Sequence, residues 1–328
     1  MDKKETILQV RDLHVHFPVK RGIIIKKTVA EVKAVDGISL DVRDGETVGL
    51  VGESGCGKTT TGRAILKLIE PTSGQIIYKG EDISSYTQKQ MLPLRHEMQM
   101  VFQDPYASLN PRMSVIDIVT DPLIEHKIIT RDEKQQKATE LLETVGLDPR
   151  YMNRFPHEFS GGQRQRIGIA RSLALKPKIL ICDEPIAALD VSIQAQVINL
   201  FQDLQEKLGL SYIFIAHDLS VVRHISDRII VMYLGKIVET ASKRDLFKNP
   251  LHPYTKVLLS SVPTPDPALE RERRRIELTG EVPSPLNKPK GCPFCTRCPD
   301  ATEQCREMEP PVTEIENGHT VACHKFTR

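Results

Sequence analysis

The sequence contains no tryptophan, and aromatic residues make up only 5% of its 328 residues. A hydrophobic fraction of 40% still supplies enough aliphatic side chains for a sizeable core, so we expect one large domain and a smaller one. The formal net charge is only +2, which gives no field to attract nucleic acid. No apolar run approaches the roughly 20 residues of a membrane-spanning helix, and the charged N-terminus is unlike a signal peptide. These absences favour a cytoplasmic chain that reaches a membrane only through a partner.

Cysteine is scarce over most of the chain and concentrated at its end. Cys56 and Cys182 are isolated, whereas the other five cysteines lie between Cys292 and Cys323. A disulfide framework is not expected in a cytoplasmic protein. Closely spaced thiols can instead hold zinc or an iron–sulfur cluster. Because this tail is short and rich in proline, we expect it to need the metal in order to fold.

The first motif with clear chemistry is Gly-Glu-Ser-Gly-Cys-Gly-Lys-Thr at residues 52–59, here called the phosphate loop. It matches GxxxxGK[ST] and lies between an apolar run at 47–51 and a helical pattern at 58–69, as a nucleotide-phosphate site requires. Backbone N–H groups of such a loop cradle the phosphates. Lys58 should reach the β- and γ-phosphates, and the Thr59 hydroxyl should bind Mg²⁺. The residues expected to bind ATP here are Gly52, Ser54, Gly55, Cys56, Gly57, Lys58, Thr59 and Thr60.

A second motif places two acids, Asp183 and Glu184, directly after the apolar run 179–182. A buried strand delivers such carboxylates to the sheet edge where open α/β folds bind ligands. Asp183 should hold Mg²⁺, directly or through water, and Glu184 should polarise the attacking water.

Strand and helix patterns alternate along the chain, which predicts an α/β fold with a mostly parallel sheet. We expect strands at 7–17, 38–42, 47–51, 98–102, 179–182 and 211–216, and helices at 58–69, 162–175 and 192–208. Residues 112–150 should be helical with breaks at Pro122, Gly146 and Pro149. Residues 18–33 should form an insertion, and the proline-rich stretch after Tyr254, with its Arg-rich run at 271–275, an irregular linker.

Four further motifs make the chain resemble the ATP-binding-cassette (ABC) ATPases over residues 7 to about 240. These are Phe-Ser-Gly-Gly-Gln at 159–163, Ala-Ala-Leu-Asp at 187–190, His217 and Gln103. Phe159 stands where the family usually has Leu, and an Ala of the 187–190 motif where it usually has Ser. The resemblance implies a P-loop NTPase (RecA-like) fold: a mostly parallel sheet, an antiparallel β subdomain, and a helical subdomain at about 104–160.

The same resemblance implies roles for these residues. Ser160, Gly161, Gly162 and Gln163 would contact ATP held by the other subunit of a dimer. His217 would contact the γ-phosphate and orient the water, while Gln103 would sense the γ-phosphate and help to bind Mg²⁺. An aromatic side chain from the first strands would stack on adenine. Phe17 is the candidate for this role, and core packing is the alternative reading.

The C-terminal cysteines, together with Asn-Pro-Leu-His-Pro-Tyr-Thr at 249–255 and Pro-Tyr-Ala-Ser-Leu-Asn-Pro at 105–111, resemble the ATPases of dipeptide/oligopeptide importers, most closely their F-type subunit. In that family four cysteines hold a 4Fe–4S cluster. They map here onto Cys292, Cys298, Cys305 and Cys323, with Cys295 as a spare thiol or competing ligand. A structural zinc site is the alternative.

The importer resemblance implies a nucleotide-binding domain at 1–262 and, at 263–328, a small irregular extension that carries the Cys-rich metal site. It implies a homologous, non-identical ATPase partner, two transmembrane permeases and, indirectly, an extracytoplasmic peptide-binding protein. The chain would lie on the cytoplasmic face of the cell membrane as a peripheral subunit. A nickel chelate or a sugar is an alternative cargo. A non-transport ABC ATPase and a redox- or iron-sensing subunit are the alternatives from other functional classes.

Overall fold

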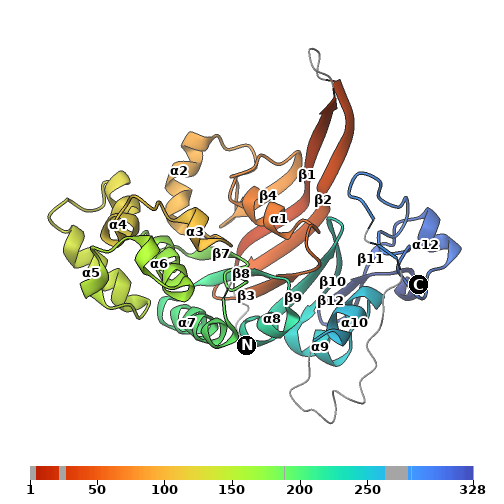
Figure 1. Cartoon of the computed structure of the whole chain (residues 1–328). Helices are drawn as coiled ribbons and strands as arrows, with labels where there is room; N and C mark the ends of the chain where they lie inside the picture. The colour runs from red at the N-terminus through yellow and green to blue at the C-terminus, as the bar shows by residue number, and fades with distance from the viewer. Residues whose placement is uncertain (1–4, 22–26, 188, 263–279, 282, 328) are drawn as a thin grey trace, which may run out of the picture. The chain divides into compact units, whose positions relative to one another are not determined.

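The computed structural model describes residues 5–21, 27–187, 189–262, 280–281 and 283–327 (Figure 1). They form two compact units. The first unit comprises residues 44–46 and 86–215, and the second comprises 5–43, 47–85 and 216–328. Our expectations for the N-terminal residues, for Ala188 and for the stretch 263–279 lie outside the described residues.

The first unit is built on a parallel sheet. Its strands are β6 (Met98–Val101), β7 (Ile179–Asp183) and β8 (Ser211–Ala216), with β7 paired to both neighbours. Every residue of β7 and β8 is buried, which explains why both strands are continuous apolar runs and do not alternate. The predicted strands at 98–102, 179–182 and 211–216 are confirmed to within one residue.

Helices make up most of the rest of the first unit. Ser160 caps α6, and α7 ends at Gly209, whose φ of 64° closes the helix in the left-handed conformation. Pro122, expected to break a helix, instead lies inside α4 near its C-terminal end. The helices are α2 (Gln88–Glu97), α3 (Pro105–Ser108), α4 (Val115–Glu125), α5 (Lys134–Thr144), η1 (Pro149–Tyr151), η2 (Pro156–Glu158), α6 (Gly161–Leu173) and α7 (Val191–Leu208).

The second unit contains an antiparallel sheet in the order β2-β1-β4-β5. Its strands are β1 (Thr6–Arg21), β2 (Lys27–Arg43), β4 (Ser73–Tyr78) and β5 (Glu81–Asp82). The expectation of an insertion at 18–33 is wrong for the described part, because Pro18 pairs with Glu31 and Arg21 with Lys27 in one long hairpin. Its outer half is exposed on both faces, so it lacks the alternation that reveals a half-buried strand.

A second run of strands in this unit has the order β11-β12-β10-β9-β3. The tail is therefore less irregular than expected, since β11 and β12 form a hairpin and β12 pairs with β10. The strands are β3 (Thr47–Val51), β9 (Arg228–Tyr233), β10 (Lys236–Ser242), β11 (Val312–Glu316) and β12 (His319–Ala322); the helices are α1 (Lys58–Ile65), α8 (Leu219–Ile225), α9 (Lys243–Lys248), α10 (Pro253–Ser260), α12 (Glu303–Glu307) and η3 (His324–Phe326). Among the described residues, no helix is both long and apolar enough to cross a bilayer.

Candidate functional site

The phosphate loop joins β3 to α1, as the sequence predicted. Two of its glycines meet backbone too closely for any side chain. A Cβ atom would lie 2.2 Å from the Met232 carbonyl oxygen at Gly52 and 2.2 Å from the Ala34 carbonyl oxygen at Gly57. Both residues have positive φ, 153° and 106°, which glycine adopts without strain. The carbonyl groups of Met232 and Ala34 thus pack directly against the loop, which fixes the direction of its N–H groups.

Lys58 lies at the start of α1 with only 4% of its surface exposed. Its Nζ donates hydrogen bonds to the carbonyl oxygens of Gly52, at 2.8 Å, and Glu53, at 3.1 Å. The ammonium group therefore lies against the loop that would cradle phosphates. Thr59 and Thr60 follow it, half-exposed on the first turn of α1. Burial raises the pKa of the Cys56 thiol, so this side chain is uncharged and packs inside the loop.

The two acids lie at the carboxyl end of β7. Asp183 is fully buried, whereas Glu184 is half-buried and has a φ of 45°, a region that non-glycine residues rarely occupy. Its N–H donates to the Ile215 carbonyl oxygen at 3.0 Å, and its Oε2 accepts a 2.9 Å hydrogen bond from Gln103 Nε2. The structure thus brings together two residues that the sequence could only assign separately. Strain of this kind often marks functional positions.

The segment 159–163 forms the N-terminus of α6. Ser160 Oγ accepts from the Gln163 N–H, and the Gln163 side chain accepts from the Ser160 N–H at 3.0 Å, a reciprocal capping box. Ser160 itself stays exposed, while Phe159 is buried. Gly162 approaches α7 so closely that a Cβ atom would lie 2.4 Å from Ile193 Cγ2. Gly162 therefore has a packing role besides any contact with nucleotide.

The motif at 187–190 leads into α7, of which Asp190 is the N-cap residue. Ala187 donates its N–H to the Glu184 carbonyl oxygen at 3.2 Å, which ties this turn to the acid pair. Val191 follows with 82% of its surface exposed, a large exposure for an aliphatic side chain.

The remaining candidates belong to the second unit. His217 follows β8 and is exposed, immediately before Asp218, which caps α8. Phe17 lies on β1 with 40% of its surface exposed, so the core-packing alternative does not fit it. The phosphate loop also lies in this unit, whereas Gln103, the acid pair and the 159–163 segment lie in the first.

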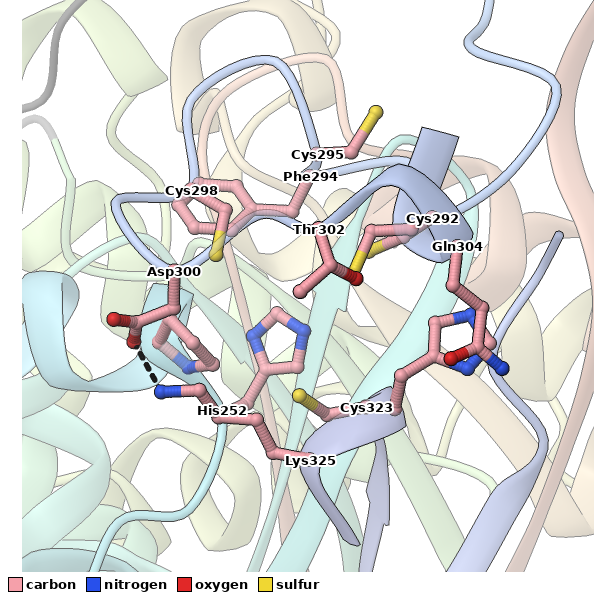
Figure 2. Close-up of a pocket in the computed structure, with 13 residues that line it drawn as sticks. His252, Cys292, Phe294, Cys295, Cys298, Asp300, Thr302, Gln304, Cys323 and Lys325 are labelled. Carbon is pink, nitrogen blue, oxygen red and sulfur yellow. Dashed lines mark hydrogen bonds and ion pairs between the residues drawn. The ribbon is translucent and has the colours of Figure 1, made fainter. Parts of the chain in front are cut away.

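All five tail cysteines line one cavity of about 130 Å³ within the second unit. In Figure 2 the sulfur atoms of Cys298 and Cys323 point into it, whereas that of Cys295 points away from them. Burial raises the pKa of Cys292 to about 12 and also raises those of Cys298 and Cys323. Without a bound group these thiols are therefore protonated. His252 also lines the cavity, and burial lowers its pKa to about 4, so its imidazole is neutral.

The loop at 292–298, which carries three of the tail cysteines, contacts the phosphate loop. The sequence did not predict this contact. Arg297, between two of the cysteines, donates from Nη1 to both carboxylate oxygens of Glu53, at 3.0 and 2.8 Å. The Glu53 N–H donates to Tyr254 Oη at 2.8 Å. The Tyr254 ring packs 5.3 Å from that of Phe294, which is fully buried. No signal in the sequence connects positions that lie 244 residues apart.

Arg297→Gln should weaken this attachment. A hydrogen-bonded ion pair that is largely shielded from water contributes about 1–3 kcal/mol, and its loss leaves a carboxylate uncompensated beside the phosphate loop. We expect a lower Tm and a several-fold higher KM for ATP. Arg297→Lys keeps the charge and should recover part of both. Thermal unfolding and phosphate-release assays check this; an unchanged KM in Arg297→Gln would contradict it.

Comparison with known proteins decides the family. Residues 35–187 match the family described as ABC transporter, and residues 238–305 match the one described as oligopeptide/dipeptide transporter, C-terminal region. The oligopeptide transport ATP-binding protein AppF of Bacillus subtilis (strain 168) is 55% identical over 325 residues, 99% of this chain and 98% of that protein. This chain belongs to the ABC transporter family.

Other similar proteins agree with this assignment. The oligopeptide transport ATP-binding protein OppF of Escherichia coli (strain K12) is 50% identical over 98% of this chain and 97% of its own length. A solved dimer of the ATP-binding cassette MJ0796, in a post-hydrolysis state bound to ADP and Pi, superposes with a TM-score of 0.65 at 28% identity, covering 73% of this chain and 99% of that one. The predicted fold class is confirmed: a P-loop ABC ATPase with a mixed sheet and a helical subdomain. The ABC ATPase binds and hydrolyses ATP.

Proposed function

We propose that this ABC ATPase powers the import of dipeptides or oligopeptides through a membrane transporter, as its F-type ATPase subunit. The observation that carries the proposal is similarity over nearly the whole chain, tail included, to oligopeptide transport ATP-binding proteins. A nickel chelate or a sugar remains an alternative cargo, because the cargo is selected by other subunits. The matched C-terminal region argues against a non-transport ABC ATPase or a dedicated redox sensor.

The partners that fit this function are a homologous, non-identical ATPase and two transmembrane permeases, with an extracytoplasmic peptide-binding protein acting through them. This chain would lie on the cytoplasmic face of the membrane. We assign residues 1–262 to the nucleotide-binding domain, with its helical subdomain at about 104–160, and 263–328 to the C-terminal extension. Val191 lies beside the N-cap of α7, and a second ATPase would cover its exposed side chain.

Within one site, the residues would act as follows. The phosphate loop and Lys58 would bind the phosphates, and Thr59, Asp183 and Gln103 would hold Mg²⁺, which when bound supplies positive charge for phosphoryl transfer. Glu184 accepts a proton from the attacking water. The hydrogen bond from Gln103 orients the Glu184 carboxylate. A change at Gln103 when the γ-phosphate binds or leaves would therefore also move Glu184.

The other subunit would complete each site. Ser160, Gly161 and Gly162 present the N-terminus of α6, whose dipole favours an anion, to the γ-phosphate of the partner's ATP. ATP then joins the two ATPases, and hydrolysis separates them. A channel with two conformations shifts its populations from 1:99 to 99:1 when a ligand binds one conformation about 5.5 kcal/mol more tightly than the other. ATP-driven closure of the two ATPases would supply this difference.

The tail thiols fit a 4Fe–4S cluster better than a single zinc ion. A zinc ion with four thiolates at about 2.3 Å holds its sulfur atoms about 3.8 Å apart. No three of the tail sulfur atoms, all of which are described, lie within 4.8 Å of one another, yet all line one cavity. We assign the cluster to Cys292, Cys298, Cys305 and Cys323. When bound, it would link the loops that these residues occupy.

Purification of the tagged chain from membranes of its host tests the importer function. We expect two hydrophobic permeases and a second, homologous ATPase to co-purify, and peptide-loaded binding protein to stimulate ATP turnover. Isolation with ribosomes or nucleic acid would instead favour a non-transport ABC ATPase. If this chain forms only a homodimer, the heterodimer proposal fails.

Anaerobic purification followed by metal analysis tests the cluster. We expect about four iron and four sulfide per chain. Cys298→Ser should lose most of this iron, whereas the matched variant Cys295→Ser should keep it, because the Cys295 sulfur points away from the other thiols. Zinc without sulfide would replace the cluster with a structural zinc site. Equal iron loss in both variants would put Cys295 among the ligands.

A further inference from the structure

Two histidines and an aspartate converge on the β1–β2 hairpin, next in the chain to Phe17 but separate from the motifs described above. His14 and His16 lie two residues apart on β1, and Asp36 lies on β2 directly opposite His14. One ligand atom from each of the three residues can be chosen so that all lie within 4.8 Å of one another. No part of the ATPase mechanism uses them.

The distances between the imidazole nitrogens and the Asp36 carboxylate fit the spacing of ligands around a metal ion better than the length of a hydrogen bond. His14 Nδ1 and His16 Nε2 each lie 3.4 Å from the same oxygen, Asp36 Oδ1. This exceeds the usual range of about 2.7–3.2 Å for an N–H···O bond. A tetrahedral ion with nitrogen and oxygen ligands at about 2.0–2.1 Å separates adjacent ligand atoms by about 3.4 Å. The buried Nε2 of His16 has no hydrogen-bond partner among the residues that the structure describes.

The other nitrogen of each imidazole faces a second carboxylate. His14 Nε2 lies 3.2 Å from Asp12 Oδ1, and His16 Nδ1 lies 3.9 Å from Glu31 Oε2. Histidines that bind a metal commonly use their other ring nitrogen in this way, which fixes the tautomer and orients the ring. Asp12 thus orients the His14 ring through a hydrogen bond, and Glu31 lies near the His16 ring. The remaining nitrogens of both rings lie near Asp36.

The backbone is shaped to make this arrangement. The register of β1 against β2 shifts just before His14 and again just before His16, and Asp12 adopts a φ of 46°. Such bulges re-aim side chains and are frequent beside functional sites. Gly37 leaves room for the ring, because a Cβ atom there would lie 3.2 Å from His14 Cε1.

We propose that His14, His16 and Asp36 bind a transition-metal ion of the zinc class, with a fourth position open to water. The side chains are 23%, 17% and 10% exposed, so an ion can enter from solvent. Lys288 lies 3.4 Å from Oδ2 of Asp36 and leaves Oδ1 to the metal. Lys33 and Lys236 also act on the Asp36 carboxylate. Two imidazole nitrogens and one carboxylate oxygen suit ions that bond to imidazole, in preference to Mg²⁺ or Ca²⁺.

Co²⁺ titration of the full-length chain tests the site, because cobalt reports its ligands by absorption. A histidine–aspartate site gives the visible bands of tetrahedral cobalt without the near-ultraviolet sulfur-to-cobalt transition that the tail cysteines would add. We expect one such sulfur-free ion per chain in the wild type. His14→Gln and His16→Gln should lose it, and Asp12→Asn should weaken it about 10–100-fold. His224→Gln, a histidine elsewhere in the same unit, should bind as the wild type does.

Zn²⁺ should raise the Tm of the wild type and of His224→Gln by mass action, and should raise it less in His16→Gln. This comparison does not require the variants to be as stable as the wild type, since each is measured with and without the ion. Cobalt bands that always carry the sulfur transition, or equal Co²⁺ stoichiometry in the wild type and in His16→Gln, would overturn the proposal.

Discussion

Glu184→Gln should bind ATP and barely hydrolyse it. The amide keeps the shape of the side chain and can still accept the 2.9 Å bond from Gln103, but it cannot take a proton from water. Loss of a general base costs about 10²–10⁴-fold in turnover. Phosphate release from the chain assembled with its partner ATPase measures the loss, and retention of ATP in a stable closed dimer shows that binding survives.

Two further variants separate chemistry from folding at this position. Glu143→Gln changes an exposed glutamate on α5 of the same unit and should turn over ATP normally. Glu184→Asn should be as inactive as Glu184→Gln yet slightly more stable, since asparagine tolerates the positive φ of 45° better than glutamate does. Turnover of Glu184→Gln within a few-fold of the wild type would remove Glu184 from the role of base.

The nucleotide motifs could be predicted from the sequence because each is local. The apolar run 47–51, the glycines of the phosphate loop and the start of α1 are adjacent in the chain, and the structure has β3 at Thr47–Val51 as expected. Because β7 and β8 are buried on both faces, their sequences are continuous apolar runs, and the strands could be predicted from these runs. In each case one short window of sequence holds both the structure and its chemistry.

Contacts between distant segments could not be predicted. The bond from Gln103 to Glu184 spans 81 positions, and the pair of Arg297 with Glu53 spans 244. In β11, four of five residues are exposed, so the apolar pattern that predicts a strand is absent and only its pairing with β12 defines it. The His14–Asp36 pair likewise depends on the register of a hairpin whose outer half looked like an insertion.

The attachment of Arg297 to Glu53 gives the cysteine tail a physical connection to ATP binding. The loop that would surround the cluster supplies the guanidinium, and the phosphate loop supplies the carboxylate. Phe294, from the same loop, is fully buried and packs against Tyr233 and Tyr254. Loss of a bound group from the thiols would therefore loosen the phosphate loop through contacts within one compact unit. The proposed cluster would thus support the phosphate loop structurally, apart from any redox chemistry.

Ser160→Asp should leave the chain folded and abolish ATP-driven closure with the partner. Ser160 Oγ has two roles: it caps α6 by accepting from the Gln163 N–H, and we assign to it a contact with the γ-phosphate of the partner's ATP. Aspartate is as good an N-cap as serine, so helix stability should be kept. Its charge, however, would face the γ-phosphate in a water-poor interface, where like charges repel by several kcal/mol. We expect turnover at the partner's site to fall at least about 100-fold.

Asparagine and alanine at the same position distinguish the two roles of Ser160. Ser160→Asn keeps the cap without the charge and should retain substantial activity. Ser160→Ala loses the cap, which costs about 1 kcal/mol, and also one hydrogen bond to the phosphate. Thermal unfolding should therefore rank alanine lowest, whereas ATPase assays of the variant mixed with wild-type partner should rank aspartate lowest. If both assays give the same order, Ser160 acts only as a helix cap, and the proposal that this chain completes its partner's site through Ser160 is wrong.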